Sequence, residues 1–255
     1  MNNLQKTLLK LKKEKRKAIS VFLTAGYPNI KTTEKLILQI EKYANIIELG
    51  IPFSDPIADG PTIQYSSQKA LENKINLEKC LSIVKNIRRK TSIPIVLMGY
   101  FNPVFNYDLK KFFYASMKAG VDGIIIPDIP YEESLQITKL AKKYNIAFIP
   151  IVALTSGINR AVKISKTSTG FIYVTAITGI TGARSELSKE LIPFLKLLKN
   201  KTNKHLLVGF GISKPEHLKE LKNYCDGFII GSAIINKIKN KESVTNFLKY
   251  LTKTL

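Results

Sequence analysis

Cysteine is scarce in this chain of 255 residues, which contains only Cys80 and Cys225. Two cysteines without metal- or redox-type spacing exclude a disulfide framework, and they fit a reducing compartment. Long apolar runs are also missing. The longest have the length of a strand, whereas a membrane-spanning helix needs roughly 20 residues. We therefore expect a globular protein without a membrane span.

Arginine and histidine are rare, although the chain carries a net charge of +21. Only five of the 40 basic residues are arginine, and the lysines are scattered along helical stretches. Arginine is the usual reader of bases and phosphates, so we expect no specific nucleic-acid partner. His205 starts a predicted strand, away from a catalytic end, and His217 has no partner at metal-ligand spacing. Neither histidine is expected to be catalytic or to bind a metal.

The amino-terminal segment Leu4–Lys12 has leucines at helical spacing. This segment is basic, but it holds few arginines, is followed by Glu14 and runs directly into an apolar strand. It therefore predicts a structural helix that closes the bottom of the fold rather than a targeting peptide. Without a cleavable signal we expect a cytoplasmic protein, or one of an organelle stroma if a plastid genome encodes the chain.

A short apolar run, a loop rich in Gly, Pro or Asp, and a helical pattern recur eight times along the chain. The apolar runs predict strands at Ala18–Thr24, Ile46–Leu49, Ile93–Met98, Gly123–Pro127, Ile146–Val152, Phe171–Val174, Leu206–Gly209 and Gly227–Ile230. The helical patterns are at Thr32–Tyr43, Leu77–Arg89, Leu109–Ala119, Glu132–Tyr144, Ala161–Thr167, Lys189–Asn200, Pro215–Tyr224 and Ala233–Ile238. Strands that alternate with helices predict a parallel sheet in an α/β fold.

Eight such units in 255 residues match a single (β/α)8 TIM barrel with an extra N-terminal helix. No linker or charge block divides residues 1–255, so we expect one domain. An open sheet that binds a dinucleotide is less well supported, because no G-x-G-x-x-G motif follows the first strand.

Two acids accompany the second predicted strand. Glu48 lies at its carboxyl end, and Asp59 lies in the next loop, which three prolines stiffen. Barrel enzymes place their chemistry at this end of the strands, so the two carboxyls are a candidate acid/base pair. The residues alone leave a second interpretation open, in which Glu48 pairs with a lysine and Asp59 caps a turn.

Glycines follow the last two predicted strands, at Gly209-Phe210-Gly211 and Gly231-Ser232. They let backbone amides approach an anion at the place where barrels often hold phosphate. The loop Thr178–Arg184 predicts a mobile lid, or else an ordinary exposed loop. Large apolar residues at strand ends are expected either to line a pocket for a flat aromatic ligand or to fill the core. They are Phe22, Met98, Tyr100, Ile125, Ile151, Tyr173 and Phe210.

The run Glu48–Gln64 resembles the alpha subunit of tryptophan synthase, and the resemblance extends over essentially the whole chain. Its other motifs are Gly179–Gly182, Gly209–Ile212 and Gly231–Ile234, of which the last two recur in other phosphate-binding barrels. The resemblance implies a carbon–carbon lyase of tryptophan biosynthesis. This enzyme cleaves indole-3-glycerol phosphate to indole and glyceraldehyde 3-phosphate.

The resemblance also implies a role for each site residue. Glu48 supplies and accepts protons, and Asp59 stays ionised and hydrogen-bonds the indole N–H. The ring lies between Phe22, Tyr100, Ile125, Tyr173 and Phe210, and the phosphate is held by Gly182, Gly211, Gly231 and Ser232. Thr181 closes the lid toward Asp59. No metal is implied.

The implied partner is the beta subunit of tryptophan synthase, in an alpha2-beta2 tetramer. That subunit holds pyridoxal phosphate, so no cofactor is expected in this chain, and Asp55 with its neighbouring prolines faces the partner. Two features depart from the family pattern: Ala176 stands where many relatives carry serine, and the lysine content is high.

Three other functions compete with this interpretation. A sugar-phosphate epimerase needs metal ligands, and an indole-glycerol-phosphate synthase needs a lysine at a strand end; neither is found. The intact pair of Glu48 and Asp59 argues against a noncatalytic scaffold.

Overall fold

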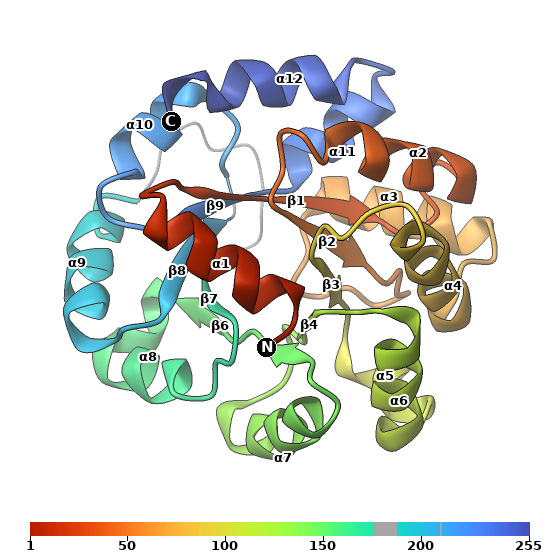
Figure 1. Cartoon of the computed structure of the whole chain (residues 1–255), viewed down its shortest axis with the longest axis horizontal. Helices are drawn as coiled ribbons and strands as arrows, with labels where there is room; N and C mark the ends of the chain where they lie inside the picture. Colours follow the sequence, from red (N-terminus) through yellow and green to blue (C-terminus); the bar gives the residue numbers. More distant parts are fainter. Residues whose placement is uncertain (176–187, 210) are drawn as a thin grey trace.

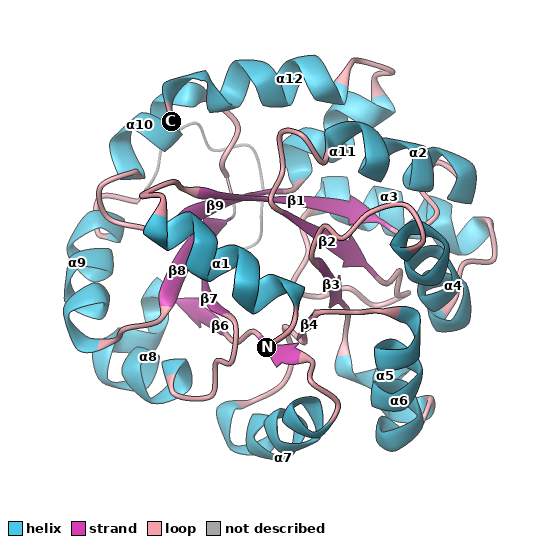
Figure 2. Cartoon of the chain, in the orientation of Figure 1, coloured by secondary structure: helices cyan, strands magenta, loops and turns pink. Residues whose placement is uncertain are grey.

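The structure is a computed structural model that describes residues 1–175, 188–209 and 211–255. Parallel strands curl into a barrel, and helices surround it (Figure 1, Figure 2). The strand order is β5-β4-β3-β2-β1-β9-β8-β7-β6. The predicted TIM-barrel fold is therefore confirmed.

The strands are β1 Ala18–Thr24, β2 Ile46–Gly50, β3 Ile95–Met98, β4 Gly123–Ile125, β5 Ala147–Phe148, β6 Ile151–Ala153, β7 Phe171–Thr175, β8 His205–Gly209 and β9 Gly227–Ile230. The first α-helices are α1 Asn3–Lys13, α2 Ile30–Ile40, α3 Pro61–Glu72, α4 Leu77–Arg88, α5 Phe101–Asn106 and α6 Leu109–Ala119. The later ones are α7 Tyr131–Lys143, α8 Gly157–Ser165, α9 Leu191–Lys201, α10 Pro215–Leu221, α11 Ser232–Lys239 and α12 Val244–Leu251. Two short 3-10 helices are η1 Leu154–Ser156 and η2 Thr252–Thr254.

The strands form the core because helices cover the outside of the sheet and side chains fill its inside. All seven residues of β1 and all five of β2 are buried. A parallel sheet covered on both faces needs such continuous apolar runs, which is why these two strands were predictable. No helix in the described ranges is long and apolar enough to cross a bilayer.

The prediction of one continuous fifth strand, Ile146–Val152, is wrong. This segment forms two short strands, β5 and β6, separated by Ile149 and Pro150. Pro150 has no N–H to donate, but its carbonyl accepts a bond from Tyr173 N at 3.0 Å, while Ile149 N donates to Ile124 O at 3.0 Å. The segment therefore pairs with β4 on one side and β7 on the other, and it closes the barrel at a seam.

Helix α1 crosses one end of the barrel, as predicted (Figure 1). Its buried leucines face the strands. The Asn2 amide donates to Asp122 O at 2.6 Å and to Asn145 O at 2.9 Å, and the Gln5 amide donates to Thr169 O at 2.8 Å. These carbonyls precede β4, β5 and β7, so α1 covers the end where strands begin.

Helices α3, α5 and α12 were not predicted. Pro61, expected to stiffen a loop, is the first residue of α3, and Gly60 caps it. A proline fits the first turn of a helix because the N–H it lacks has no partner there. The loop that carries Asp59 is therefore held between the end of β2 and the start of α3.

Candidate active site

Glu48 is fully buried in the middle of β2, beside Phe22 of β1 in the strand register. Ser20 Oγ donates a hydrogen bond of 2.7 Å to Glu48 Oε1. Oε2 has no hydrogen-bond partner among the described residues. Burial raises the pKa of Glu48 from 4.5 to about 7, and the bond from Ser20 acts in the opposite direction. Its side chain is therefore suited to exchange protons near neutral pH.

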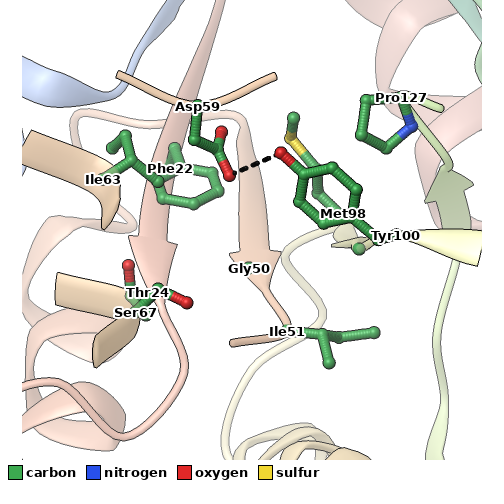
Figure 3. A pocket seen from close by; sticks show the side chains of 11 residues that line it. Phe22, Thr24, Gly50, Ile51, Asp59, Ile63, Ser67, Met98, Tyr100 and Pro127 are labelled. Atoms are coloured by element: carbon green, nitrogen blue, oxygen red, sulfur yellow. Dashed lines mark hydrogen bonds between the residues drawn. The ribbon is translucent and has the colours of Figure 1, made fainter. Parts of the chain in front are cut away.

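Asp59 lies in the loop between β2 and α3, and Tyr100 holds its side chain (Figure 3). The Tyr100 hydroxyl donates to Asp59 Oδ2 at 3.1 Å and accepts a bond from Ala58 N at 2.9 Å. Burial raises the pKa of Asp59 from 3.8 to about 6, against the lowering effect of the bond from Tyr100. At pH 7 Asp59 is thus mostly ionised, whereas Glu48 is about half protonated.

A cavity lies at the carboxyl ends of β1, β2 and β3, and Asp59 lines it (Figure 3). Its other lining residues are Phe22, Thr24, Gly50, Ile51, Ile63, Ser67, Met98, Gly99, Tyr100 and Pro127. The volume of about 20 Å³ has room for about one water molecule.

Glu48 does not line this cavity. It lies two residues before Gly50 on the same face of β2, one layer deeper in the barrel. The ring of Phe22 lies over Gly50, where an added Cβ would overlap it. Phe22 therefore occupies the space at the end of β2, next to the layer that holds Glu48.

Tyr173 of β7 shows that Glu48 and Asp59 face the same interior of the barrel. Burial raises the pKa of its hydroxyl well above the usual value, and the charges of Glu48 and Asp59 raise it further. Such effects require short distances. Gly209 of β8 leaves room for Tyr173, because a Cβ there would overlap the phenol oxygen. Tyr173 therefore faces both acids from the other side of the barrel.

The other predicted site residues have different outcomes. Ile125 ends β4, is fully buried and is not among the cavity-lining residues. Gly211, with φ 84°, follows β8, and Gly231 caps α11, which begins at Ser232. Strands β8 and β9 are neighbours in the sheet, so these glycines follow adjacent strand ends. Thr181, Gly182 and Phe210 lie outside the described residues, as do Ala176 and the whole loop Thr178–Arg184.

Several residues at this site were not predicted. Thr24 and Ser67 line the cavity, and Ser67 comes from the unpredicted helix α3. Ser20 was also missed, although a polar residue in the apolar run of β1, two positions before Phe22, is the signal that marks it.

The two histidines lie in the elements predicted for them, a strand and a helix. His205 begins β8, and His217 lies in α10, where its Nδ1 accepts a bond from Ser213 N at 3.4 Å. Within the described ranges, no group of three or more His, Cys, Asp and Glu residues is placed to hold a metal ion.

The chain is similar over nearly its whole length to known proteins of one family. The profile of the family "Tryptophan synthase alpha chain" matches residues 8–254. The tryptophan synthase alpha chain of Caldanaerobacter subterraneus subsp. tengcongensis is 45% identical over 98% of this chain and 95% of its own length.

Two solved structures are also similar. Subunit alpha from Legionella pneumophila has 32% identity and a TM-score of 0.88, over 100% of this chain and 97% of its own. A chain of the Pyrococcus furiosus tryptophan synthase a2b2 complex has 38% identity and a TM-score of 0.84, over 93% of this chain and 95% of its own. The protein is therefore a member of the tryptophan synthase alpha chain family, lyases that cleave indole-3-glycerol phosphate in tryptophan biosynthesis and use no cofactor of their own.

Proposed function

We propose that Glu48 is the proton donor and acceptor of this cleavage and that Asp59 stabilises the ring cation. The observation that carries the proposal is the state of Glu48. It is a fully buried carboxyl with a pKa of about 7, a bond on one oxygen and no partner for the other in the described part of the chain. A purely structural buried carboxylate is normally paired.

In the first step, neutral Glu48 donates its proton to C3 of the indole ring. The ring nitrogen then carries a positive charge, and ionised Asp59 accepts a hydrogen bond from its N–H. This interaction is stronger in the cation than in the neutral ring, so it lowers the barrier rather than only binding the substrate.

In the second step, the Glu48 carboxylate accepts the proton of the side-chain hydroxyl next to the ring. The carbon that bears this hydroxyl becomes the aldehyde carbon of glyceraldehyde 3-phosphate. The electrons of the broken carbon–carbon bond return to the ring and neutralise it. Indole leaves, and Glu48 is protonated again, so one residue completes the cycle.

The two pKa values support these different roles of Glu48 and Asp59. Before reaction, Glu48 must be neutral and Asp59 must be ionised, which holds best between about pH 6 and about pH 7. The same values predict a bell-shaped pH dependence of kcat/KM, with an acid limb from Asp59 and a basic limb from Glu48.

We assign substrate binding to the aromatic wall and to the strand ends beyond it. Phe22, Tyr100 and Tyr173 would contact the indole ring, together with Ile125 and Phe210. The backbone at Gly211, Gly231 and Ser232 would hold the phosphate, supported by the start of the eight-residue helix α11. Gly182 and Thr181 complete the predicted set.

A beta subunit is the partner that the comparisons support. The Pyrococcus furiosus relative is described in an a2b2 complex with mutual activation. For this chain we propose the same alpha2-beta2 assembly, with pyridoxal phosphate in the beta subunit and the exposed Asp55 toward it. We also propose that residues 1–255 form one domain and that the protein acts in the cytoplasm or an organelle stroma.

The test is Glu48→Gln, assayed for indole release with and without a beta subunit. Gln keeps the size of Glu48 but cannot exchange protons at neutral pH, so turnover should disappear while calorimetry with glyceraldehyde 3-phosphate still detects binding. Glu78→Gln, at an exposed position in the first turn of α4, is the matched control. Indole release by the Glu48 variant at the wild-type rate would refute the proposal.

A further inference from the structure

We infer that Ser20 is a positioning residue, which holds Oε1 of Glu48 and leaves Oε2 as the atom that exchanges the proton with the substrate. This inference rests on the proposed role of Glu48, and it assigns that role to one of the two carboxyl oxygens.

The strand register places Ser20 below Glu48. Ser20 pairs with Ile46, and Phe22 pairs with Glu48, in the parallel ladder of β1 and β2. Ser20 therefore lies on the same face as Phe22, one layer deeper in the barrel. Both Ser20 and Glu48 are 0% exposed, so water does not compete for their bond of 2.7 Å. A hydroxyl in such an apolar strand needs a partner, and Glu48 is the partner that this structure gives it.

The direction of this bond decides where the acid carries its proton. Ser20 Oγ donates to Oε1, and in the described part of the chain its hydrogen has no other acceptor. If Oε1 carried the proton, the serine hydroxyl would have to turn round, and its own hydrogen would then be left unpaired. A proton on Oε2 keeps the bond intact. The neutral acid therefore presents the proton on Oε2, whose hydrogen-bonding capacity is unused by the described residues.

Among the groups around Glu48, Ser20 is the one whose hydrogen bond shifts the pKa of this carboxyl. Tyr173 faces it from β7, and Asp59 lies in the loop after β2. Two influences on the pKa of Glu48 are resolved: burial, which raises it, and the bond from Ser20, which lowers it. Removing the hydroxyl must therefore raise the pKa of Glu48, because the carboxylate loses the bond that stabilises its charge.

The experiment compares Ser20→Ala, Ser20→Thr and Ser20→Cys with the wild type. The first readout is the titration of the Glu48 carboxyl by 13C NMR, with its signal identified by its loss in Glu48→Gln. The second is the pH dependence of kcat and KM for indole release. In Ser20→Ala we expect the NMR titration and the basic limb to move upward together by about one pH unit. We also expect kcat to fall about tenfold with KM nearly unchanged.

A matched control is Ser168→Ala. Ser168 is 1% exposed and donates one bond of 2.7 Å to Phe171 O, before the start of β7 and away from the cavity. This substitution removes an equally buried hydroxyl and an equally short bond, so it should cost stability without moving the basic limb. Ser20→Thr should restore the wild-type limb, because threonine keeps the hydroxyl.

An unmoved NMR titration and basic limb in folded Ser20→Ala would overturn the inference. So would an equal shift in Ser168→Ala. If Ser20→Ala does not fold, Ser20→Cys decides: its thiol is a weaker donor, so an upward shift smaller than one unit supports the inference and no shift refutes it. Turnover by Glu48→Gln would instead refute the proposed function, which separates the two failures.

Discussion

Tyr100 holds Asp59 and the residue before it at the same time. Its hydroxyl donates to Asp59 Oδ2 at 3.1 Å and accepts from Ala58 N at 2.9 Å. The ring also packs against Phe53, with 5.3 Å between ring centroids. One aromatic side chain at the end of β3 thus fixes the loop that carries Asp59.

Tyr100→Phe should therefore change the ionisation of Asp59. Without the phenol bond, the carboxylate loses a donor and its pKa rises above about 6. Since we propose that Asp59 acts as an anion, the acid limb of kcat/KM should move to higher pH, with the largest deficit below pH 7. Measurements of kcat/KM over about pH 5 to 9 will show this shift of the acid limb. Tyr250→Phe, at an exposed position, is the control. A deficit that is equal at every pH would contradict it.

Asp59→Asn keeps the shape of the side chain and removes its charge. If Asp59 stabilises the ring cation, kcat should fall roughly a hundredfold or more, equivalent to about 3 kcal/mol of barrier. Steady-state indole release measures this loss. Asp55→Asn, in the same loop but exposed, should leave the rate of the isolated chain unchanged. A wild-type rate for the Asp59 variant would remove Asp59 from the mechanism.

Glu48 should make the protein less stable as the pH rises. The folded state keeps its proton up to about pH 7, whereas the unfolded chain releases it near pH 4.5. Between these values the native state binds more protons, so the free energy of unfolding falls with increasing pH. At 1.36 kcal/mol per unit, the loss is about 3 kcal/mol.

Glu48→Gln should abolish that part of the pH dependence. Urea unfolding at about pH 5 and pH 8 should show a stability advantage of the variant that grows by about 2.5 kcal/mol with pH. Glu78→Gln provides the baseline. An advantage that stays constant over this range would mean that Glu48 has an ordinary pKa in the folded protein.

Gly50→Ala should destabilise the fold and hinder the site. The added Cβ would overlap the ring of Phe22, so this ring or β2 must shift, at a cost of about 1–3 kcal/mol. In Gly231→Ala the new Cβ would lie 3.6 Å from Phe22 Cβ, an ordinary contact, and stability should change little. Thermal unfolding of both variants tests the difference, and equal melting temperatures would contradict it.

Gly231→Leu tests the phosphate site. A bulky side chain at the cap of α11 would keep the anion away from the backbone amides, and KM for indole-3-glycerol phosphate should rise about tenfold or more. Melting curves establish that the variant is folded. An unchanged KM would place the phosphate elsewhere.

Much of the fold was predictable because the relevant signals are local. The buried runs of β1 and β2 are continuous in the sequence, and the leucines of α1 recur at helical spacing. The break at Pro150 was not predictable from periodicity, because it depends on two different neighbours, β4 and β7. Pro61 fits a loop and a first helical turn equally well, so α3 was missed.

The acids could be named from the sequence, but the hydrogen bonds that hold them could not. The bond from Ser20 to Glu48 spans 28 positions, and the bond from Tyr100 to Asp59 spans 41. No periodicity reports such distant contacts. The same limit applies to the strand-end residues, among which Phe22 and Tyr100 line the cavity and Ile125, which is fully buried, does not.

The seam between β5 and β6 gives the amino-terminal helix a second purpose. Asn2 and Gln5 fasten α1 to the chain before β4, β5 and β7, which are the strands that flank this interruption. The helix therefore links the beginnings of strands on both sides of this interruption. Loss of these three bonds would therefore weaken the attachment of α1 to the end of the barrel where β4, β5 and β7 begin.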